Sequence, residues 1–241
     1  MALLRQLYHE IIEDLEGLVS ETAVDDKILR ETAERYGLSN LSYLAVNVPT
    51  LTKDRPYGVH TYGAEWEERY VTENYIEIDP VVRHGLAGLL PLDWRHVRNE
   101  NERVKRFFDE AGEFKVGLQG LSFPIRGLHG ETALFSINAH VSDVEWRALM
   151  RRSVKDFQIL AYHFHTLVLE REGVIFEDVK LSARETECLK WASSGKTSWE
   201  TGMILGISAK TVDFFLEQAR VKLLTVNKIQ SVSKAIRLGL I

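Results

Sequence analysis

The chain has 241 residues, 45% of them hydrophobic, which is enough for one large domain and one small domain, each with its own core. Its single cysteine, Cys188, excludes an internal disulfide, and no run approaches the roughly 20 apolar residues needed to span a bilayer. The formal net charge of −5 would by itself argue against a nucleic-acid-binding protein.

The charge is unevenly distributed along the chain. Residues 176–241 hold 10 Lys and Arg against 7 Asp and Glu, whereas residues 1–175 hold 20 against 28. The basic excess therefore lies at the C-terminal end. The first residues, MALLRQLYHEIIEDLEG, carry acids among their apolar positions and lack a signal-peptide core. We expect a cytoplasmic protein in which Cys188 is a buried structural residue.

The first 80 residues alternate between helical and strand periodicity. Apolar positions at helical spacing predict helices, and short alternating runs predict strands. The pattern predicts helices over 4–19, 24–36 and 64–75 and strands over 41–48 and 58–62. Asp79-Pro80 then opens a short helical segment, since proline suits a first helical turn.

A hairpin and a long helix follow. Residues 89–97 are predicted to be irregular, 101–114 an amphipathic helix, and 116–125 and 132–139 two strands joined by a glycine-bearing turn. Ser142 and Glu145 form a capping box that starts a helix over 143–170. Helices, then strands, then a covering helix predict a mixed sheet between helical layers.

Aromatic residues gather around one aspartate in the first domain. Ligand pockets are mostly apolar and aromatic, with a few polar groups that fix orientation. An Asp carboxylate, a Trp indole and Tyr hydroxyls together match an amide flanked by carbonyls. An ordinary core with a helix-capping Asp is the other interpretation, and spacing alone favours it. The residues concerned are Tyr62, Trp66, Tyr70, Tyr75, Asp79 and Trp94.

The last 61 residues predict a helix-turn-helix. Ser182 and Glu185 form a capping box, and Gly195 suits a helix C-terminus. A short helix is expected over 198–205 and a longer one over 209–224, on either side of the turn Gly206-Ile207-Ser208. In such units the helix after the turn lies in the major groove. The sequence Gly195-Lys196-Thr197 lacks the upstream glycine of a phosphate-binding loop, so nucleotide binding is not expected.

This segment resembles the DNA-binding domain of the LuxR family of quorum-sensing transcription factors, a four-helix helix-turn-helix. The resemblance runs in register to the end of the chain. The matching residues are Glu185, Leu189, Trp191, Gly195-Lys196-Thr197, Glu200, Ile207-Ser208, Thr211-Val212, Lys222-Leu223 and Gly239-Leu240-Ile241.

Most of residues 20–170 also resemble the autoinducer-binding domain of that family. The resemblance implies an α-β-α sandwich around a five-stranded antiparallel sheet, so the fold class is α/β (α+β) with an all-α second domain. The boundaries expected are 1–170 for the autoinducer-binding domain, 171–180 for a linker and 181–241 for the DNA-binding domain. The matching motifs are Trp66-x3-Tyr70, Asp79-Pro80, Trp94, and Gly120 ahead of Pro124-Ile125.

The resemblance implies a role for each matching residue. Trp66 would donate to the lactone carbonyl of an N-acyl homoserine lactone, Asp79 would accept the amide N–H, and Tyr62 and Ser136 would serve the acyl carbonyl. Other residues would form the pocket wall, namely Tyr70, Trp94 and the strands near Tyr43, Leu121 and Ile137. Three aromatics match no such role and are expected in the core, namely Tyr75, Trp146 and Trp199.

The expected recognition helix departs from its relatives. Acids stand at Asp213 and Glu217, where they either accept from a cytosine amino group or are simply exposed to solvent. Phe214 belongs to the same expected DNA surface, whereas Phe215 is expected in the core. Phosphate contacts are expected from basic and hydroxyl side chains on this unit, namely Lys196, Thr197, Lys210, Thr211 and Lys222.

The expected function is a transcription factor that binds a lactone and, as a homodimer, a palindromic DNA site, with no metal, cofactor or membrane. A repressor of the same family that is ligand-independent or released by lactone remains an alternative. A response regulator would need a parallel βα receiver, which the clustered strands disfavour. An enzyme is also disfavoured, because His163 and His165 stand two apart, which is neither a metal-ligand spacing nor a nucleophile motif.

Overall fold

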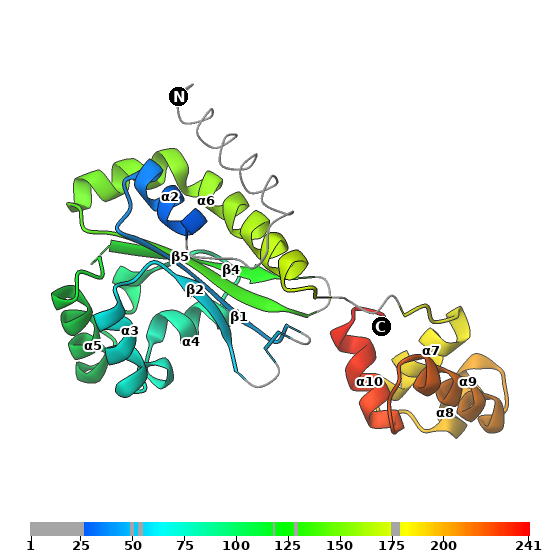
Figure 1. Ribbon diagram of the computed structural model, residues 1–241. Helices are drawn as coiled ribbons and strands as arrows, with labels where there is room; N and C mark the ends of the chain where they lie inside the picture. The colour runs from blue at the N-terminus through cyan, green and yellow to red at the C-terminus, as the bar shows by residue number, and fades with distance from the viewer. Residues whose placement is uncertain (1–26, 49–50, 53–54, 118, 128–129, 175–178) are drawn as a thin grey trace. The chain divides into compact units, whose positions relative to one another are not determined.

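The computed structural model describes residues 27–48, 51–52, 55–117, 119–127, 130–174 and 179–241 (Figure 1). The helix predicted over 4–19 lies outside these residues. The chain divides into two compact units, one formed by residues 1–126 and 131–175 and the other by residues 127–130 and 176–241. Each unit is described by itself.

The first unit contains a sheet and its covering helices. Its elements are α2 (Lys27–Tyr36), β1 (Asn40–Val46), β2 (Tyr57–His60), α3 (Ala64–Thr72), the 3₁₀ helix η2 (Tyr75–Glu77), α4 (Pro80–Ala87), β3 (Leu92–Asp93), the 3₁₀ helix η3 (Trp94–His96), α5 (Glu102–Glu113), β4 (Gln119–Arg126), β5 (Thr132–Ala139) and α6 (Asp143–Arg171).

The sheet has five strands in the order β2-β1-β5-β4-β3, and every neighbouring pair is antiparallel. Helices α2 and α6 cover one face, and α3, α4 and α5 cover the other (Figure 1). The α-β-α sandwich and the hairpin of β4 and β5 are confirmed. The prediction of a mixed sheet is wrong, because a mixed sheet contains parallel pairs and all four pairs of this sheet are antiparallel. The stretch 89–97 is not wholly irregular, because it contains β3 and η3, which are too short to give a periodic pattern.

Alternation along the strands divides the first unit into two apolar layers. Leu41, Tyr43 and Ala45 of β1 are buried with residues of α2 and α6. Ser42 and Leu44, at the intervening positions, face the opposite side and border a cavity under α3, α4 and α5. Because successive side chains of a strand point to opposite faces, a single strand contributes to both layers.

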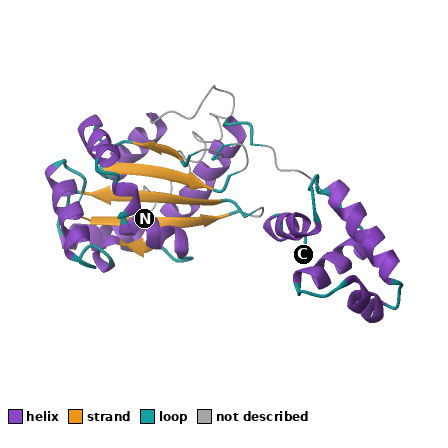
Figure 2. Cartoon of the chain, turned by 90° about the horizontal axis from the view of Figure 1, so that it is seen from below, coloured by secondary structure: helices purple, strands orange, loops and turns teal. Residues whose placement is uncertain are grey.

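The described residues of the second unit form helices joined by loops, as the secondary-structure colours of Figure 2 show. It consists of α7 (Ala183–Ser193), α8 (Ser198–Leu205), α9 (Ala209–Lys222) and α10 (Lys228–Arg237). Capping boxes start α7 and α8, and Ser208 caps α9. Gly206 ends α8 at φ 68°, a left-handed conformation that suits glycine. This order of caps and turns is the expected helix-turn-helix.

The core of the second unit is small and apolar. Cys188, Leu189 and Val212 are completely buried, which agrees with a structural role for the cysteine. Phe215 packs against this core. Trp199 was expected there as well, but it is 66% exposed. Only Thr201 and Gly202 of α8 are buried, so the position of Trp199 in a short apolar helix did not imply burial.

Candidate functional site

A cavity of about 370 Å³ lies between the sheet and the three helices on its second face. Its floor is the sheet, and its walls and roof come from α3, α4 and α5. The lining includes Ser42, Leu44, Gly58, His60, Leu134 and Ser136 from the strands and Tyr62, Trp66, Tyr70, Asp79, Val81, Trp94, Phe107, Phe108 and Ala111 from the segments above. The cavity is thus mostly apolar and aromatic, with polar groups at a few positions.

Asp79 has two roles in this cavity. Its Oδ1 accepts the backbone N–H groups of Val81 (2.8 Å) and Val82 (3.4 Å) and so caps α4. Its Oδ2 accepts the Tyr70 hydroxyl at 2.8 Å. Burial raises the pKa of Asp79, against the opposing effect of these hydrogen bonds. The aspartate is therefore both a helix cap and a cavity-lining acceptor, and the two interpretations of the sequence do not exclude one another.

Trp66 is buried among other rings of the cavity wall. Its ring centroid lies 6.0 Å from that of Tyr70, 5.8 Å from that of Phe107 and 5.6 Å from that of Phe114. Within the described part of the chain, no residue accepts a hydrogen bond from its indole N–H, although an indole N–H in a protein interior normally has a partner. The packing thus fixes the ring and leaves its donor uncommitted.

The indole N–H of Trp94, unlike that of Trp66, donates a hydrogen bond within the protein. Its Nε1 donates to Oγ of Ser122 at 2.9 Å, and Ser122 in turn lies 2.7 Å from Oγ of Ser136. The ring lies directly over Gly120, where an added Cβ would be 2.1 Å from the indole. Gly120 therefore permits the close approach that sets Trp94 against the sheet.

Tyr62 and Ser136 lie on the same side of the sheet. The Tyr62 hydroxyl accepts from Nδ2 of Asn138 at 3.3 Å and lies 3.4 Å from Oγ of Ser42. Burial raises the pKa of Tyr62 to about 12, so the hydroxyl keeps its proton at neutral pH. Ser42, Ser122 and Asn138 were not among the residues expected at the site, although they alternate on their strands in the same way as Ser136.

Tyr43 is among the residues that line the cavity, but its side chain packs into the layer under α6. Its hydroxyl is hydrogen-bonded to Nδ1 of His165 in α6 at 2.6 Å, and its ring packs on Phe164. Leu121 and Ile137 also belong to the layer under α6. The two-residue period of the strands places their neighbours Ser42, Ser122 and Ser136 on the cavity side instead. Tyr75 and Trp146 are buried, as expected.

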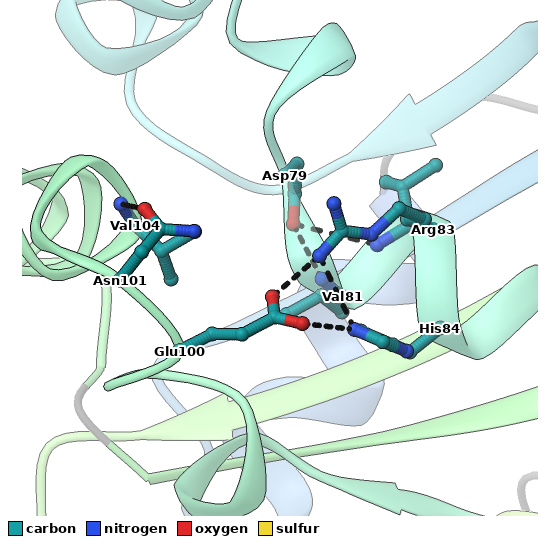
Figure 3. A network of polar contacts seen from close by, with 8 residues as sticks. Asp79, Val81, Arg83, His84, Glu100, Asn101 and Val104 are labelled. Carbon is teal, nitrogen blue, oxygen red and sulfur yellow. Dashed lines mark hydrogen bonds and ion pairs between the residues drawn. The ribbon is translucent and has the colours of Figure 1, made fainter.

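Contacts with Glu100 and Arg126 hold helix α4, which has Asp79 at its N-terminus, and Figure 3 shows those with Glu100. Glu100, between η3 and α5, pairs with Arg83 and with Nε2 of His84, the latter at 3.0 Å. Arg126 at the end of β4 donates to the carbonyl oxygens of Leu86 and Gly88. Each exposed ion pair contributes little by itself, but together they connect the α4 wall of the cavity to its neighbours.

In the second unit, α9 presents an exposed face. Val212, Leu216 and Ala219 are buried, whereas six side chains are exposed, namely Lys210, Asp213, Phe214, Glu217, Val221 and Lys222. Both acids of this face have partners, because Asp213 accepts the hydroxyl of Ser198 at 2.5 Å and Glu217 pairs with Arg220 at 2.6 Å. Their charges are therefore partly satisfied within the unit.

The candidate phosphate-binding side chains differ in their surroundings. Lys222 lies 2.7 Å from the buried carboxylate of Glu185 and joins the end of α9 to the start of α7. Lys196 pairs with Glu200 at 3.4 Å, and Thr197 caps α8. Thr211 lies 2.7 Å from the hydroxyl of Ser208. Lys210 is exposed and, among the described residues, has no ion-pair partner within 4.0 Å.

Comparisons with known proteins assign both units. Residues 26–168 match the autoinducer binding domain, and residues 179–235 match the family of bacterial regulatory proteins called the luxR family. The transcriptional activator protein RaiR of Rhizobium etli is 36% identical over 174 residues, which are 71% of this chain and 72% of RaiR.

Two solved structures have the same fold. Escherichia coli SdiA has a TM-score of 0.58 at 18% identity and covers 97% of this chain and 98% of its own. The N-acylhomoserine lactone dependent LuxR family factor CepR2 from Burkholderia cenocepacia has a TM-score of 0.53 at 16% identity, over 70% of this chain and 99% of its own.

These matches concern transcriptional regulators and not enzymes. No helix among the described residues is long and apolar enough to cross a membrane. An autoinducer-binding domain is followed by a DNA-binding domain of the helix-turn-helix type, and both belong to one kind of regulator. The chain is therefore a member of the LuxR family of autoinducer-binding transcriptional regulators.

Proposed function

We propose that the chain binds an N-acyl homoserine lactone in the cavity of its first unit and, as a homodimer in the cytoplasm, binds a two-fold-symmetric DNA site to regulate transcription. The observation that carries this proposal is the set of polar groups in the apolar cavity. Trp66 offers an N–H donor, Asp79 a carboxylate acceptor, and Tyr62 and Ser136 hydroxyls. An amide between two carbonyls needs this complement of partners.

Each polar group has one place on such a ligand. The indole N–H of Trp66 donates to the lactone carbonyl, Oδ2 of Asp79 accepts the amide N–H beside the hydroxyl of Tyr70, and Tyr62 and Ser136 donate to the acyl carbonyl. The apolar walls receive the acyl chain. Support for this class of ligand comes from CepR2, which is described as N-acylhomoserine lactone dependent.

Ligand binding would act on the stability of the first unit. Apolar surface removed from water contributes roughly 25 cal/mol per Å², so a lactone and a short acyl chain contribute several kcal/mol. A ligand that binds the folded state alone stabilises it by mass action. The enclosed lactone then completes the apolar layer under α3, α4 and α5 and favours the folded, dimerising form.

DNA binding is assigned to α9 and the residues around it. Helix α9 follows the turn of the helix-turn-helix and enters the major groove, with Lys196, Thr197, Lys210 and Thr211 near phosphates and Asp213, Phe214 and Glu217 near base edges. Two such helices in a dimer reach half-sites about one helical turn apart. Lys222, held by Glu185, positions the end of α9.

The test is to express the protein with a panel of lactones, identify the retained molecule by mass spectrometry, and measure melting temperature and DNA affinity with and without it. We expect one retained lactone, a higher melting temperature and a changed affinity for a DNA site selected from a random pool. Trp66→Phe removes the indole donor, and Trp199→Phe is the matched control outside the cavity. Equal melting temperatures and equal DNA affinities in both conditions would contradict the proposal. A lactone that weakens DNA binding would identify a lactone-released repressor.

A further inference from the structure

One carboxylate joins three elements that cover the cavity. Glu110 of α5 accepts the hydroxyl of Tyr75 from η2 and Nε of Arg69 from α3. Arg69 also pairs with Glu73, at the end of α3, at 2.7 Å. Glu110, Tyr75 and Arg69 are not among the residues that line the cavity. The carboxylate therefore connects α3, η2 and α5 from outside the ligand space.

The bond from Tyr75 to Glu110 is a charge-assisted one. Burial, followed by the hydrogen bond to Glu110, raises the pKa of Tyr75 to about 12, so its hydroxyl keeps the proton that it donates. The hydrogen bond from Tyr75 and, after it, that from Arg69 lower the pKa of Glu110, which is therefore ionised at neutral pH. Hydrogen bonds to an ionised acceptor are stronger than those between neutral groups.

The segment that carries Tyr75 has little stability of its own. Helix η2 is a single 3₁₀ turn of three residues. Asn74, which precedes it, has a left-handed conformation (φ 52°) and makes no side-chain hydrogen bond to the turn. Short 3₁₀ turns have poor hydrogen-bond geometry. The side-chain bond to Glu110 thus ties this turn to the longer helix α5.

Tyr75 contacts both polar groups at the head of the proposed site. Its ring centroid lies 5.8 Å from that of Trp66, and its carbonyl oxygen accepts the backbone N–H of Asp79 at 2.8 Å. Phe107, one turn before Glu110 on α5, lies 5.1 Å from the Tyr75 ring and 5.8 Å from Trp66. The position of Tyr75 therefore affects the spacing between the indole donor and the carboxylate acceptor.

That spacing matters for a lactone because its polar groups are close together. In a homoserine lactone the amide nitrogen and the carbonyl carbon are attached to the same ring carbon, so their separation is nearly fixed. A donor and an acceptor held in place before the ligand arrives bind it with a smaller loss of entropy. A small shift of Trp66 would weaken its bond to the lactone carbonyl more than its apolar contacts, because hydrogen bonds are directional.

We propose that Glu110 is a positioning residue for the ligand, which acts through Tyr75 to hold the indole N–H of Trp66 at the spacing from Asp79 that a lactone requires. This inference rests on the proposed function. Without the carboxylate, Tyr75 loses its anchor on α5. Trp66 then stays buried among the other rings, but its N–H is no longer aligned with the lactone carbonyl.

The experiment compares two ligands on the full-length protein. One is an acyl homoserine lactone that the protein binds, and the other is the cyclopentyl amide with the same acyl chain, which lacks the lactone carbonyl and ring oxygen. We expect the lactone to bind about three- to tenfold more tightly, the usual net effect of one hydrogen bond. Glu110→Ala and Tyr75→Phe are each expected to reduce this ratio to less than about twofold. A general loss of stability would weaken both ligands alike and leave the ratio unchanged.

Three further variants test whether the effect passes through Trp66. Glu110→Gln should keep the ratio, because its amide oxygen can accept from Arg69 and its amide N–H can donate to the Tyr75 hydroxyl. Glu113→Ala, an exposed position on the same helix, should also keep it. In protein that carries Trp66→Phe the ratio should already be lost, and adding Glu110→Ala should reduce it no further.

The outcomes separate this inference from the proposed function. If the ratio depends on Trp66 but survives both Glu110→Ala and Tyr75→Phe, Glu110 has no positioning role and lactone binding stands. If Glu110→Ala does not fold, Tyr75→Phe alone decides, because it removes only the hydroxyl. Equal affinity of the unaltered protein for the two ligands would overturn the donor role of Trp66 and this inference with it. If no lactone binds, the proposed function itself fails.

Discussion

The hydroxyl of Tyr70 donates to Oδ2 of Asp79 across 2.8 Å and so joins α3 to the first turn of α4. Both residues line the cavity. Since Oδ1 of Asp79 is occupied in capping α4, the bond from Tyr70 sets the direction of the oxygen that remains for a ligand. A substitution of Tyr70 therefore changes the ionisation and the side-chain orientation of Asp79 while the residue at position 79 stays the same.

Tyr70→Phe is expected to destabilise the protein more at neutral pH than in acid. Burial raises the pKa of Asp79 above its ordinary value of 3.8. The folded protein therefore loses stability as the pH rises from 3.8 through the raised pKa, because Asp79 is then ionised at a buried position. The Tyr70 bond opposes this loss because it stabilises the ionised form. We expect a cost of about 1.5–3 kcal/mol near pH 7 and a smaller one near pH 4.

Urea unfolding at the two pH values measures this difference. Tyr57→Phe is the control, because it also removes a tyrosine hydroxyl that donates to a carboxylate. In this case the acceptor is Glu172, and the hydrogen bond is exposed to solvent. An equal loss for Tyr70→Phe at both pH values would show that the hydroxyl does not stabilise the charged form of Asp79.

Gly120→Ala is expected to displace Trp94 and weaken the cavity wall. The new Cβ would lie 2.1 Å from the indole, which is rigid and cannot yield in the way a flexible chain end can. Overpacking of this kind costs about 1–3 kcal/mol and would also break the bond from Trp94 to Ser122. Gly63→Ala, where no heavy atom lies within 4 Å of the new Cβ, is expected to cost less, since it loses only the preference for glycine over alanine at the N-cap of α3. Similar melting temperatures for the two variants would refute the packing argument.

Two lysines of α9 are expected to behave differently. Lys210→Ala should reduce the slope of log affinity against log salt by about 0.9, the value for one phosphate contact. Lys222→Ala should leave that slope unchanged and lower the stability of the second unit, because it leaves the buried Glu185 without its cation. Fluorescence titrations over a range of salt concentrations and thermal melts measure the two effects. A reduced slope of log affinity against log salt for Lys222→Ala would show that Lys222 contacts a phosphate after all.

The ion pair of Lys222 with Glu185 makes the stability of the second unit depend on pH. Burial alone would raise the pKa of Glu185, but hydrogen bonds from Lys222 and from Ser182 hold it below its ordinary value of 4.5. A depressed carboxyl pKa stabilises the fold above the unfolded value, and this contribution is lost as pH falls below about 4.5. Glu185→Gln should make melting less sensitive to acid.

Local sequence patterns were enough to predict most elements and the β4–β5 hairpin, but not the pairing of strands that are distant in the sequence. The capping boxes at Ser142 and Ser182 and the alternation of β4 and β5 are properties of adjacent residues, and they gave the correct helices and hairpin. Strand β3 has only two residues and makes no pattern.

The alignment of Ser42, Ser136 and Ser122 on three adjacent strands could not be predicted from the sequence alone. It depends on the pairing of β1 with β5, strands that lie about 90 residues apart, and that register decides which serines meet. The face taken by Tyr43 and the pairing of Lys222 with Glu185 are likewise set by tertiary packing. Asp79 was recognised because its neighbours Trp66 and Tyr70 are close in the sequence.

Phe214 is expected to read the methyl group of a thymine. It is 57% exposed on α9, and its ring is held 5.7 Å from that of Phe215, which packs on the core. Apolar side chains on a recognition helix discriminate thymine through its methyl group, and one buried methyl group contributes about 0.8 kcal/mol, or roughly a fourfold change in affinity.

The test replaces each thymine of a selected duplex by uracil in turn, which removes only the methyl group. The unaltered protein should lose affinity at one position in each half-site, and Phe214→Ala should bind the thymine and uracil duplexes equally. Trp199→Ala, which removes an exposed aromatic from α8 instead, should keep the thymine preference. If Phe214→Ala retains that preference, the methyl group is read by another side chain, and the exposed ring of Phe214 then has no part in sequence recognition.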